Sequence, residues 1–130
     1  MLWLNDASDA ELNYCYRHAD CYLTASVDEG FGMPMIEGAR LGLPILCSDI
    51  PVFHEVSQGQ ADFFPVSDPE GLCEAVEKWL ATDEHPDPGK IRIYTWRESA
   101  EAILRILRGE QEPYRVISSP GREEQVHCEK

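Results

Sequence analysis

Basic side chains are scarce in this sequence. Its 130 residues include 11 lysines and arginines against 24 aspartates and glutamates, which gives a formal net charge of −13. Arg17 and Arg40 are the only lysines or arginines before Lys78. Nucleic acids and anionic lipids attract positively charged protein surfaces, so this charge balance argues against a nucleic-acid partner.

Long apolar segments are also missing. No apolar run approaches the roughly 20 residues that a membrane-spanning helix needs. The chain begins MLWLNDASDA, which has neither the basic start nor the apolar core of a signal peptide. We therefore expect no transmembrane segment and a cytoplasmic protein.

The sequence contains no recognisable metal-binding pattern. His54 and Glu55 begin like a zinc-protease motif, but Gln58 occupies the place of its second histidine, and no Asp-x-Asp pair occurs. The five cysteines form no Cys-x-x-Cys pair, and most lie in apolar segments, which predicts reduced thiols that pack as small core side chains. They are Cys15, Cys21, Cys47, Cys73 and Cys128. We expect neither a metal ion nor a cofactor.

Helix and strand signals alternate along the first half of the chain. The spacing of Ser8 and Glu11 is typical of a capping box at the start of a helix. Short apolar runs bounded by turn residues predict buried strands. The sequence predicts helices over residues 9–18, 34–41 and 51–56, alternating with strands over 21–25, 43–47 and 61–66.

Two further helices are predicted in the second half. A capping box of Ser67 and Glu70 opens a helix that ends near residue 81, and another at Thr95 and Glu98 opens a helix that stops at Gly109. Leu72, Val76, Trp79 and Leu80 are predicted to share one face of the first of these. Residues 82–90 are predicted to be a linker, and the polar residues 110–130 a mobile tail after a domain of residues 1–109.

Such alternation predicts an α/β fold, because parallel strands need crossover connections and these are usually helices. The fold class is therefore a Rossmann-like parallel sheet flanked by helices. Ligands bind such sheets beyond the carboxyl ends of the strands. The segment from Ser26 to Pro34 runs from a predicted strand end into a predicted helix N-terminus, which makes it the candidate site.

The segment DEGFGMPMIE, residues 28–37, carries the chemistry of this candidate site. Gly30 and Gly32 allow a ligand to approach the backbone, and the helix that follows directs unpaired amides toward the same space, as an anion such as phosphate requires. Glu29 and Glu37 are placed to accept hydrogen bonds from sugar hydroxyls. Together these features indicate a nucleotide diphosphate sugar. Acidic residues near a helix N-terminus also stabilise helices without any binding role, which leaves a purely structural interpretation open.

EGFGMPMIE, followed by GARLGLPILCSDIPVFHEV, resembles the glutamate-x7-glutamate region of retaining glycosyltransferases of the GT-B architecture. The resemblance is strongest to glycosyltransferase family four, the group 1 glycosyl transferases, and extends from about Trp3 to Gly109. It implies that the chain is the C-terminal portion of a GT-B donor-binding domain.

The resemblance also implies roles for single residues. Glu29 would be the catalytic residue and contact the hydroxyls of the donor sugar, while Glu37 would hold the ribose hydroxyls. The backbone amides near Phe31 would contact sugar or phosphate, and Ser26 would line the pocket. The implied donor-binding residues are Ser26, Glu29, Gly30, Phe31, Gly32, Met33 and Glu37.

The implied reaction moves a sugar, with GDP-mannose as the favoured donor, to a hydroxyl of a glycan or lipid-linked acceptor without a metal ion and with retained configuration. A glycosidase that uses Glu29 and Glu37 as its acid and nucleophile is a weaker alternative, since nothing else indicates the cleft it needs. A catalytically inert nucleotide-sugar-binding or protein-interaction module is the other alternative.

The scarcity of basic residues departs from the family pattern. A diphosphate site normally includes cationic side chains, and the segment before Lys78 offers only Arg17 and Arg40. We therefore expect that an N-terminal portion of the enzyme, with those cations and the acceptor site, is missing from this chain. The isolated chain is then inactive, and the full-length enzyme acts at the inner face of the membrane.

Overall fold

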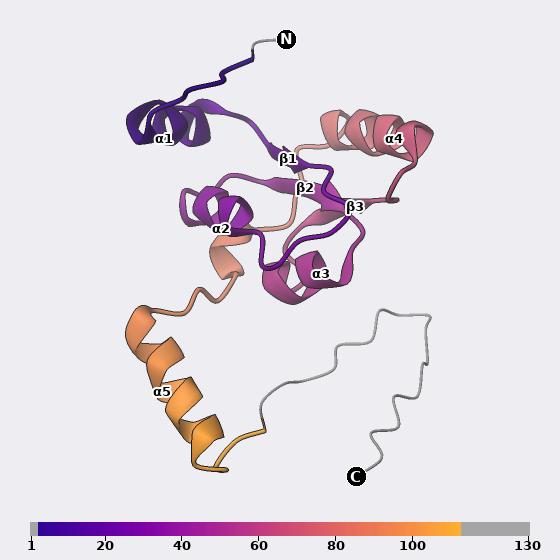
Figure 1. Ribbon diagram of the computed structural model, residues 1–130. Coiled ribbons are helices and arrows are strands. Elements are labelled where there is room, and N and C mark those ends of the chain that lie inside the picture. The colour runs from indigo at the N-terminus through magenta and orange to yellow at the C-terminus, as the bar shows by residue number, and fades with distance from the viewer. Residues whose placement is uncertain (1–2, 113–130) are drawn as a thin grey trace. The chain divides into compact units, whose positions relative to one another are not determined.

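The computed structural model describes residues 3–112 and divides into two compact units between Ile91 and Arg92. The first unit contains a parallel sheet whose strand order is β1-β2-β3 (Figure 1). The strands are β1 (Tyr22–Thr24), β2 (Ile45–Ser48) and β3 (Asp62–Phe64). Leu23 pairs with Leu46, and Cys47 pairs with Phe63. The predicted parallel sheet is thereby confirmed.

Helices alternate with these strands in the predicted order. The helices of the first unit are α1 (Asp9–His18), α2 (Met33–Arg40), α3 (Pro51–Ser57) and α4 (Pro69–Leu80), and a short 3-10 turn follows at η1 (Pro88–Lys90). Figure 1 shows α2 and α3 on one side of the strands and α4 on the other. The arrangement is the Rossmann-like α/β fold that the sequence predicts.

The core lies around β2, helix α2, which precedes it in the chain, and helix α3, which follows it. All four residues of β2 are buried, as expected for a central strand covered on both faces. Met35 of α2 and Phe53 of α3 are among the largest fully buried side chains. These contacts fix the position of α2 on the sheet, and with it the loop that precedes α2.

The start of α4 differs from the prediction. Asp68, not Ser67, is the N-cap, and its Oδ1 accepts hydrogen bonds from the amides of Glu70 at 3.1 Å and Gly71 at 3.0 Å. The reason is Pro69, because proline is favoured at the first helical position and so makes the residue before it the cap. Ser67 instead has a left-handed backbone with φ of 58°.

The predicted apolar face of α4 is correct except for its last member. Leu72, Val76 and Trp79 are half-buried, whereas Leu80 is 72% exposed. Leu80 follows Trp79 directly and is therefore rotated about 100° around the helix. It lies outside the stripe that faces the sheet.

The second unit contains helix α5 (Trp96–Leu107), whose predicted capping box is present. The amide of Thr95 donates to Glu98 Oε2 at 2.7 Å, and the amide of Glu98 donates to Thr95 Oγ1 at 3.2 Å. Thr95 Oγ1 also donates to Glu98 Oε2 at 2.8 Å, and the two hydrogen bonds that the carboxylate accepts from Thr95 lower the pKa of Glu98. Gly109, at φ of 70°, follows the helix end. The domain boundary at residue 109 stays a prediction, and residues 113–130 of the predicted tail lie outside the described residues.

The cysteines are less buried than the sequence indicated. Cys47 is fully buried and Cys21 is half-buried, but Cys15 and Cys73 are exposed, and all four are free thiols. Cys15 and Cys73 lie on the outer sides of their helices, which the apolar character of their segments did not reveal. Cys128 lies outside the described residues.

Alkylation of the folded protein at pH 8 is expected to modify Cys15 and Cys73 at least about 1,000-fold faster than Cys47, because the thiolate is the reactive form. Burial raises the pKa of Cys47 to about 12, so its thiolate is depleted at that pH. Time-resolved peptide mapping by mass spectrometry after iodoacetamide treatment measures the rates, and the denatured chain serves as the control. Equal rates for Cys47 and Cys73 in the folded protein would contradict the buried position of Cys47.

Candidate functional site

The candidate site is the loop of residues 25–32, which connects the carboxyl end of β1 to the N-terminus of α2. The side chain of Ser48, the last residue of β2, is almost fully buried, and its Oγ donates a hydrogen bond to the carbonyl of Ser26. This bond ties the start of the loop to the end of the neighbouring strand. The loop therefore lies at the edge of the sheet where α/β proteins bind ligands.

Glu29 is oriented by the hydroxyl groups that precede it. Ser26 Oγ donates to Glu29 Oε1 at 2.9 Å and lies 3.4 Å from Thr24 Oγ1. The carboxylate itself is exposed, and its second oxygen has no partner among the described residues. The sequence predicted Ser26 as a pocket wall, and the structure adds that it holds the Glu29 side chain.

Glu37 is exposed near the middle of α2 and contacts a residue that the sequence did not single out. Tyr16 Oη, from α1, donates to Glu37 Oε2 at 3.3 Å. The two residues are 21 positions apart, and no local pattern pairs them. This contact appears only when the chain path places α1 beside α2.

Tyr22, at the start of β1, has a pKa that both glutamates affect. Burial raises the pKa of Tyr22, hydrogen bonding with Thr24 lowers it, and the negative charges of Glu29 and Glu37 raise it again. That Glu29 and Glu37 face one crevice stays a prediction.

Gly32 gives the loop its final turn. It is the N-cap of α2 with φ of 77° and ψ of 47°, a left-handed conformation that side chains disfavour. A Cβ atom at this position would lie 2.8 Å from Cε1 of Phe53. Gly30 differs, because no atom lies within 4 Å of the position that its Cβ would occupy. Only one of the two predicted glycines is therefore required by the fold itself.

The N-terminus of α2 is open toward the loop. No side chain caps the helix, so its partial positive charge is not neutralised by a carboxylate from the protein. Phe31 and Met33, on either side of Gly32, are exposed. An anion bound here would contact backbone amides and two apolar side chains.

Residues 3–77 contain two arginines and no lysine. Arg17 Nε donates to Asn13 Oδ1 at 2.8 Å on α1. Arg40 is the last residue of α2, and a helix of eight residues places it about 12 Å from the loop at 1.5 Å per residue. The expectation that the cationic clamp belongs to another portion of the enzyme stays a prediction.

Comparison with known proteins decides the family. Residues 1–91 match the sequence model of the family described as glycosyl transferases group 1. The chain belongs to this family. The match covers the whole sheet, the loop with its two glutamates and helices α1 to α4.

Several curated glycosyltransferases are similar to this group 1 chain. The serotype-specific mannosyltransferase WbdA of Escherichia coli is 41% identical over 110 residues, which cover 82% of this chain and 14% of WbdA. The O-antigen chain mannosyltransferase RfbU of Salmonella typhimurium is 37% identical over 75 residues, 58% of this chain and 21% of RfbU. The O-antigen chain mannosyltransferase B of Escherichia coli is 31% identical over 100 residues, 77% of this chain and 23% of its own. The chain thus spans only a small part of each relative.

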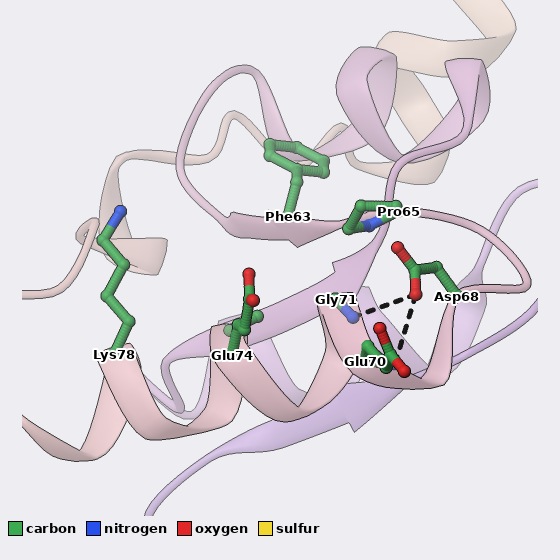
Figure 2. A pocket seen from close by; sticks show the side chains of 8 residues that line it. Phe63, Pro65, Asp68, Glu70, Gly71, Glu74 and Lys78 are labelled. Carbon is green, nitrogen blue, oxygen red and sulfur yellow. Dashed lines mark hydrogen bonds between the residues drawn. The ribbon is translucent and has the colours of Figure 1, made fainter.

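Two clefts in this group 1 chain lie along α4 and do not include the loop. One of about 350 Å³ lies between β3 and α4, with Phe63 above it and carboxylates along α4 (Figure 2). Asp68, one of these carboxylates, caps the helix, and Lys78 is the cation in the lining. An acidic lining of this kind disfavours a nucleotide diphosphate.

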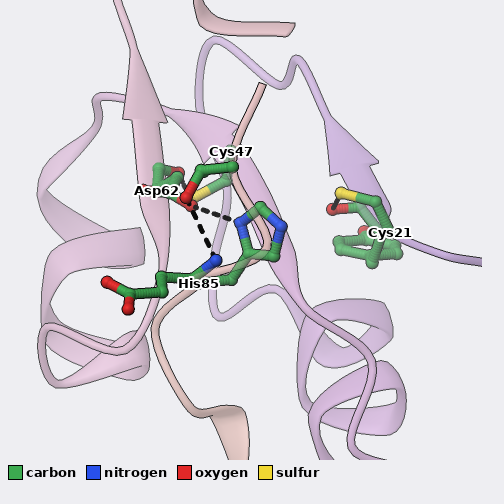
Figure 3. Close-up of polar contacts among 7 residues, drawn as sticks. Cys21, Cys47, Asp62 and His85 are labelled. Carbon is green, nitrogen blue, oxygen red and sulfur yellow. Dashed lines mark hydrogen bonds and ion pairs between the residues drawn. The ribbon is translucent and has the colours of Figure 1, made fainter. Parts of the chain in front are cut away.

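The second cleft has a volume of about 500 Å³ and lies at the other end of α4. Trp79 lines it and stacks on His85 with a ring separation of 4.2 Å. His85 faces Asp62 at 3.7 Å, beside Cys47 (Figure 3). These contacts explain the half-buried histidine as part of the packing of α4 on the sheet.

Within residues 3–112, no group of three or more His, Cys, Asp or Glu side chains is arranged to hold a metal ion. In the same range, no helix is both long and apolar enough to cross a membrane.

Proposed function

We propose that this chain is the donor-site portion of a retaining glycosyltransferase that transfers a sugar from a nucleotide diphosphate sugar to an acceptor hydroxyl in polysaccharide synthesis. The observation that carries the proposal is the loop after β1, in which Glu29, held by Ser26, lies just before the uncapped N-terminus of α2. The family match supports the reaction class.

Each part of the donor has a partner in this arrangement. Glu37 binds the ribose hydroxyls, and the N-terminus of α2, with the amides from Gly30 to Met33, faces the diphosphate. Glu29, held by Ser26, contacts the hydroxyls of the donor sugar as the catalytic residue. The chain positions the donor and stabilises the charge that develops on the leaving phosphate, without a metal ion.

Mannose is the proposed sugar and GDP-mannose the proposed donor. WbdA and RfbU, two similar proteins, are named mannosyltransferases, and RfbU is named for the O-antigen chain. The acceptor is accordingly a glycan or a lipid-linked glycan. The enzyme works in the cytoplasm, at the inner face of the membrane.

The remaining cations of the diphosphate site belong, in this proposal, to another portion of a longer enzyme. The chain spans 14% of the WbdA sequence, and Arg17 and Arg40 are the only arginine or lysine side chains among residues 3–77. The isolated chain therefore binds donor weakly and shows no sugar transfer. The same shortage of cations is compatible with an inert nucleotide-sugar-binding module. Such a module also binds the donor, but it shows no sugar transfer even within the longer protein.

An NMR titration of the 130-residue chain with GDP-mannose, and with UDP- and ADP-sugars for comparison, tests the donor site. The amides of Glu29 to Met33 are expected to shift, and Glu37→Ala is expected to weaken the response about 10-fold, as loss of hydrogen bonds to a charged group implies. Glu77→Ala, at an exposed position on α4, is the matched control and is expected to leave the response unchanged. If about 10 mM nucleotide shifts no amide of the loop, any affinity is weaker than millimolar, and this result would refute the donor site.

A further inference from the structure

Tyr16 contacts the candidate ribose-binding glutamate from a separate helix. Its ring is half-buried, lies 6.3 Å from the ring of Tyr22, and approaches Gly38 so closely that a Cβ there would be 3.7 Å from Tyr16 Cδ1. The ring is thus held between α1, α2 and β1. Its hydroxyl reaches past this packing to Glu37 Oε2 at 3.3 Å.

The direction of this hydrogen bond is fixed by chemistry. Burial and the negative charge of Glu37 raise the pKa of Tyr16 to about 12, so the phenol keeps its proton at neutral pH. An ionised carboxylate can only accept. Tyr16 is therefore the donor and Glu37 the acceptor throughout the neutral range.

The bond restricts a side chain that would otherwise be mobile. Glu37 is exposed on a helix, and a free glutamate samples several rotamers that must be lost when it binds a ligand. Holding Oε2 reduces that freedom before the ligand arrives and leaves Oε1 available to accept from a vicinal diol.

We propose that Tyr16 is a positioning residue, whose hydroxyl holds Glu37 Oε2 and so presents Oε1 to the ribose hydroxyls of the donor. This inference rests on the proposed function, since it assigns a purpose to Glu37 in the same site. The group recognised through Tyr16 is a ribose with free 2′ and 3′ hydroxyls. A purely structural role would need only the aromatic ring, which phenylalanine supplies.

Titrations of the full 130-residue chain with GDP and with 2′,3′-dideoxy-GDP separate these roles. Tyr16→Phe is expected to weaken GDP binding about 3- to 10-fold, because it removes a hydrogen bond to a charged group, and to leave dideoxy-GDP binding within about twofold. Tyr14→Phe is the matched control, since Tyr14 is exposed on the same helix and stacks on His18 at 3.9 Å. It is expected to change neither affinity.

Other outcomes overturn the inference in distinguishable ways. If Tyr16→Phe loses affinity equally for GDP and dideoxy-GDP, the hydroxyl acts on packing. If it loses affinity for neither, the hydroxyl contributes nothing to binding. In both cases a reduced response of Glu37→Ala would leave the proposed function intact. No response of the wild-type chain to either nucleotide would remove the proposed function and this inference together.

A measurement without nucleotide tests the same contact. Three-bond couplings at Cβ of Glu37 are expected to report one dominant χ1 rotamer in the wild-type chain and averaged rotamers in Tyr16→Phe. Averaged couplings already present in the wild-type chain would show that Tyr16 does not hold the side chain.

Discussion

Gly32→Ala is expected to destabilise the first unit by about 2–5 kcal/mol and to abolish the response of the loop to nucleotides. Two independent costs combine. Any side chain at φ of 77° is strained, and the new Cβ would lie 2.8 Å from Phe53 Cε1 in a packed core. Denaturant unfolding followed by circular dichroism gives the free energy of unfolding, and the NMR titration gives the binding.

Gly30→Ala is the matched control for this substitution. Gly30 lies two residues earlier in the same loop, has no atom within 4 Å of its Cβ position, and does not have a positive φ. Its replacement is expected to change the free energy of unfolding by less than about 0.5 kcal/mol. Equal stability of the two variants would contradict the left-handed turn at Gly32 and the position of Phe53 beneath it.

The elements of the fold were predictable where a local rule decides them. Ser8 and Glu11 form a capping box because the three-residue spacing alone brings their groups together, and Thr95 and Glu98 do the same. Ser67 was the wrong cap because two rules competed there, and proline at the first helical position outweighed the capping-box spacing. Exposure was less predictable, since Cys73 lies in an apolar segment but on the outer side of α4.

The candidate site was predictable in part for the same reason. The position of Glu29 after a strand and of Glu37 within the next helix follows from the order of the elements. The contacts of Tyr16 with Glu37 and of Ser48 with Ser26 join residues 21 and 22 positions apart, and only the tertiary path of the chain creates them. The contact between Gly32 and Phe53 likewise depends on the tertiary path of the chain.

Phe53→Ala is expected to cost about 3–5 kcal/mol, since it removes an aromatic ring from the core and leaves a cavity. Phe53 is 1% exposed and is one of the largest fully buried side chains. A loss of this size approaches the whole stability of a small domain, so a substantial fraction of the chain is expected to be unfolded at 25 °C. Circular dichroism in the absence of denaturant measures this fraction. A fully folded variant with an unchanged unfolding midpoint would contradict the central position of the ring.

Combining Gly32→Ala with the milder Phe53→Leu separates the two costs at the turn. Leucine lacks the Cε1 atom that meets the new Cβ, so the steric cost of Gly32→Ala falls while its backbone cost remains. The double variant is therefore expected to be about 1–2 kcal/mol more stable than the sum of the single effects predicts. Strict additivity would mean that the ring and the turn do not touch. A positive coupling, together with recovery of the nucleotide response, would show that α3 shapes the donor loop through this one contact, although none of its residues contacts the ligand in the proposed site.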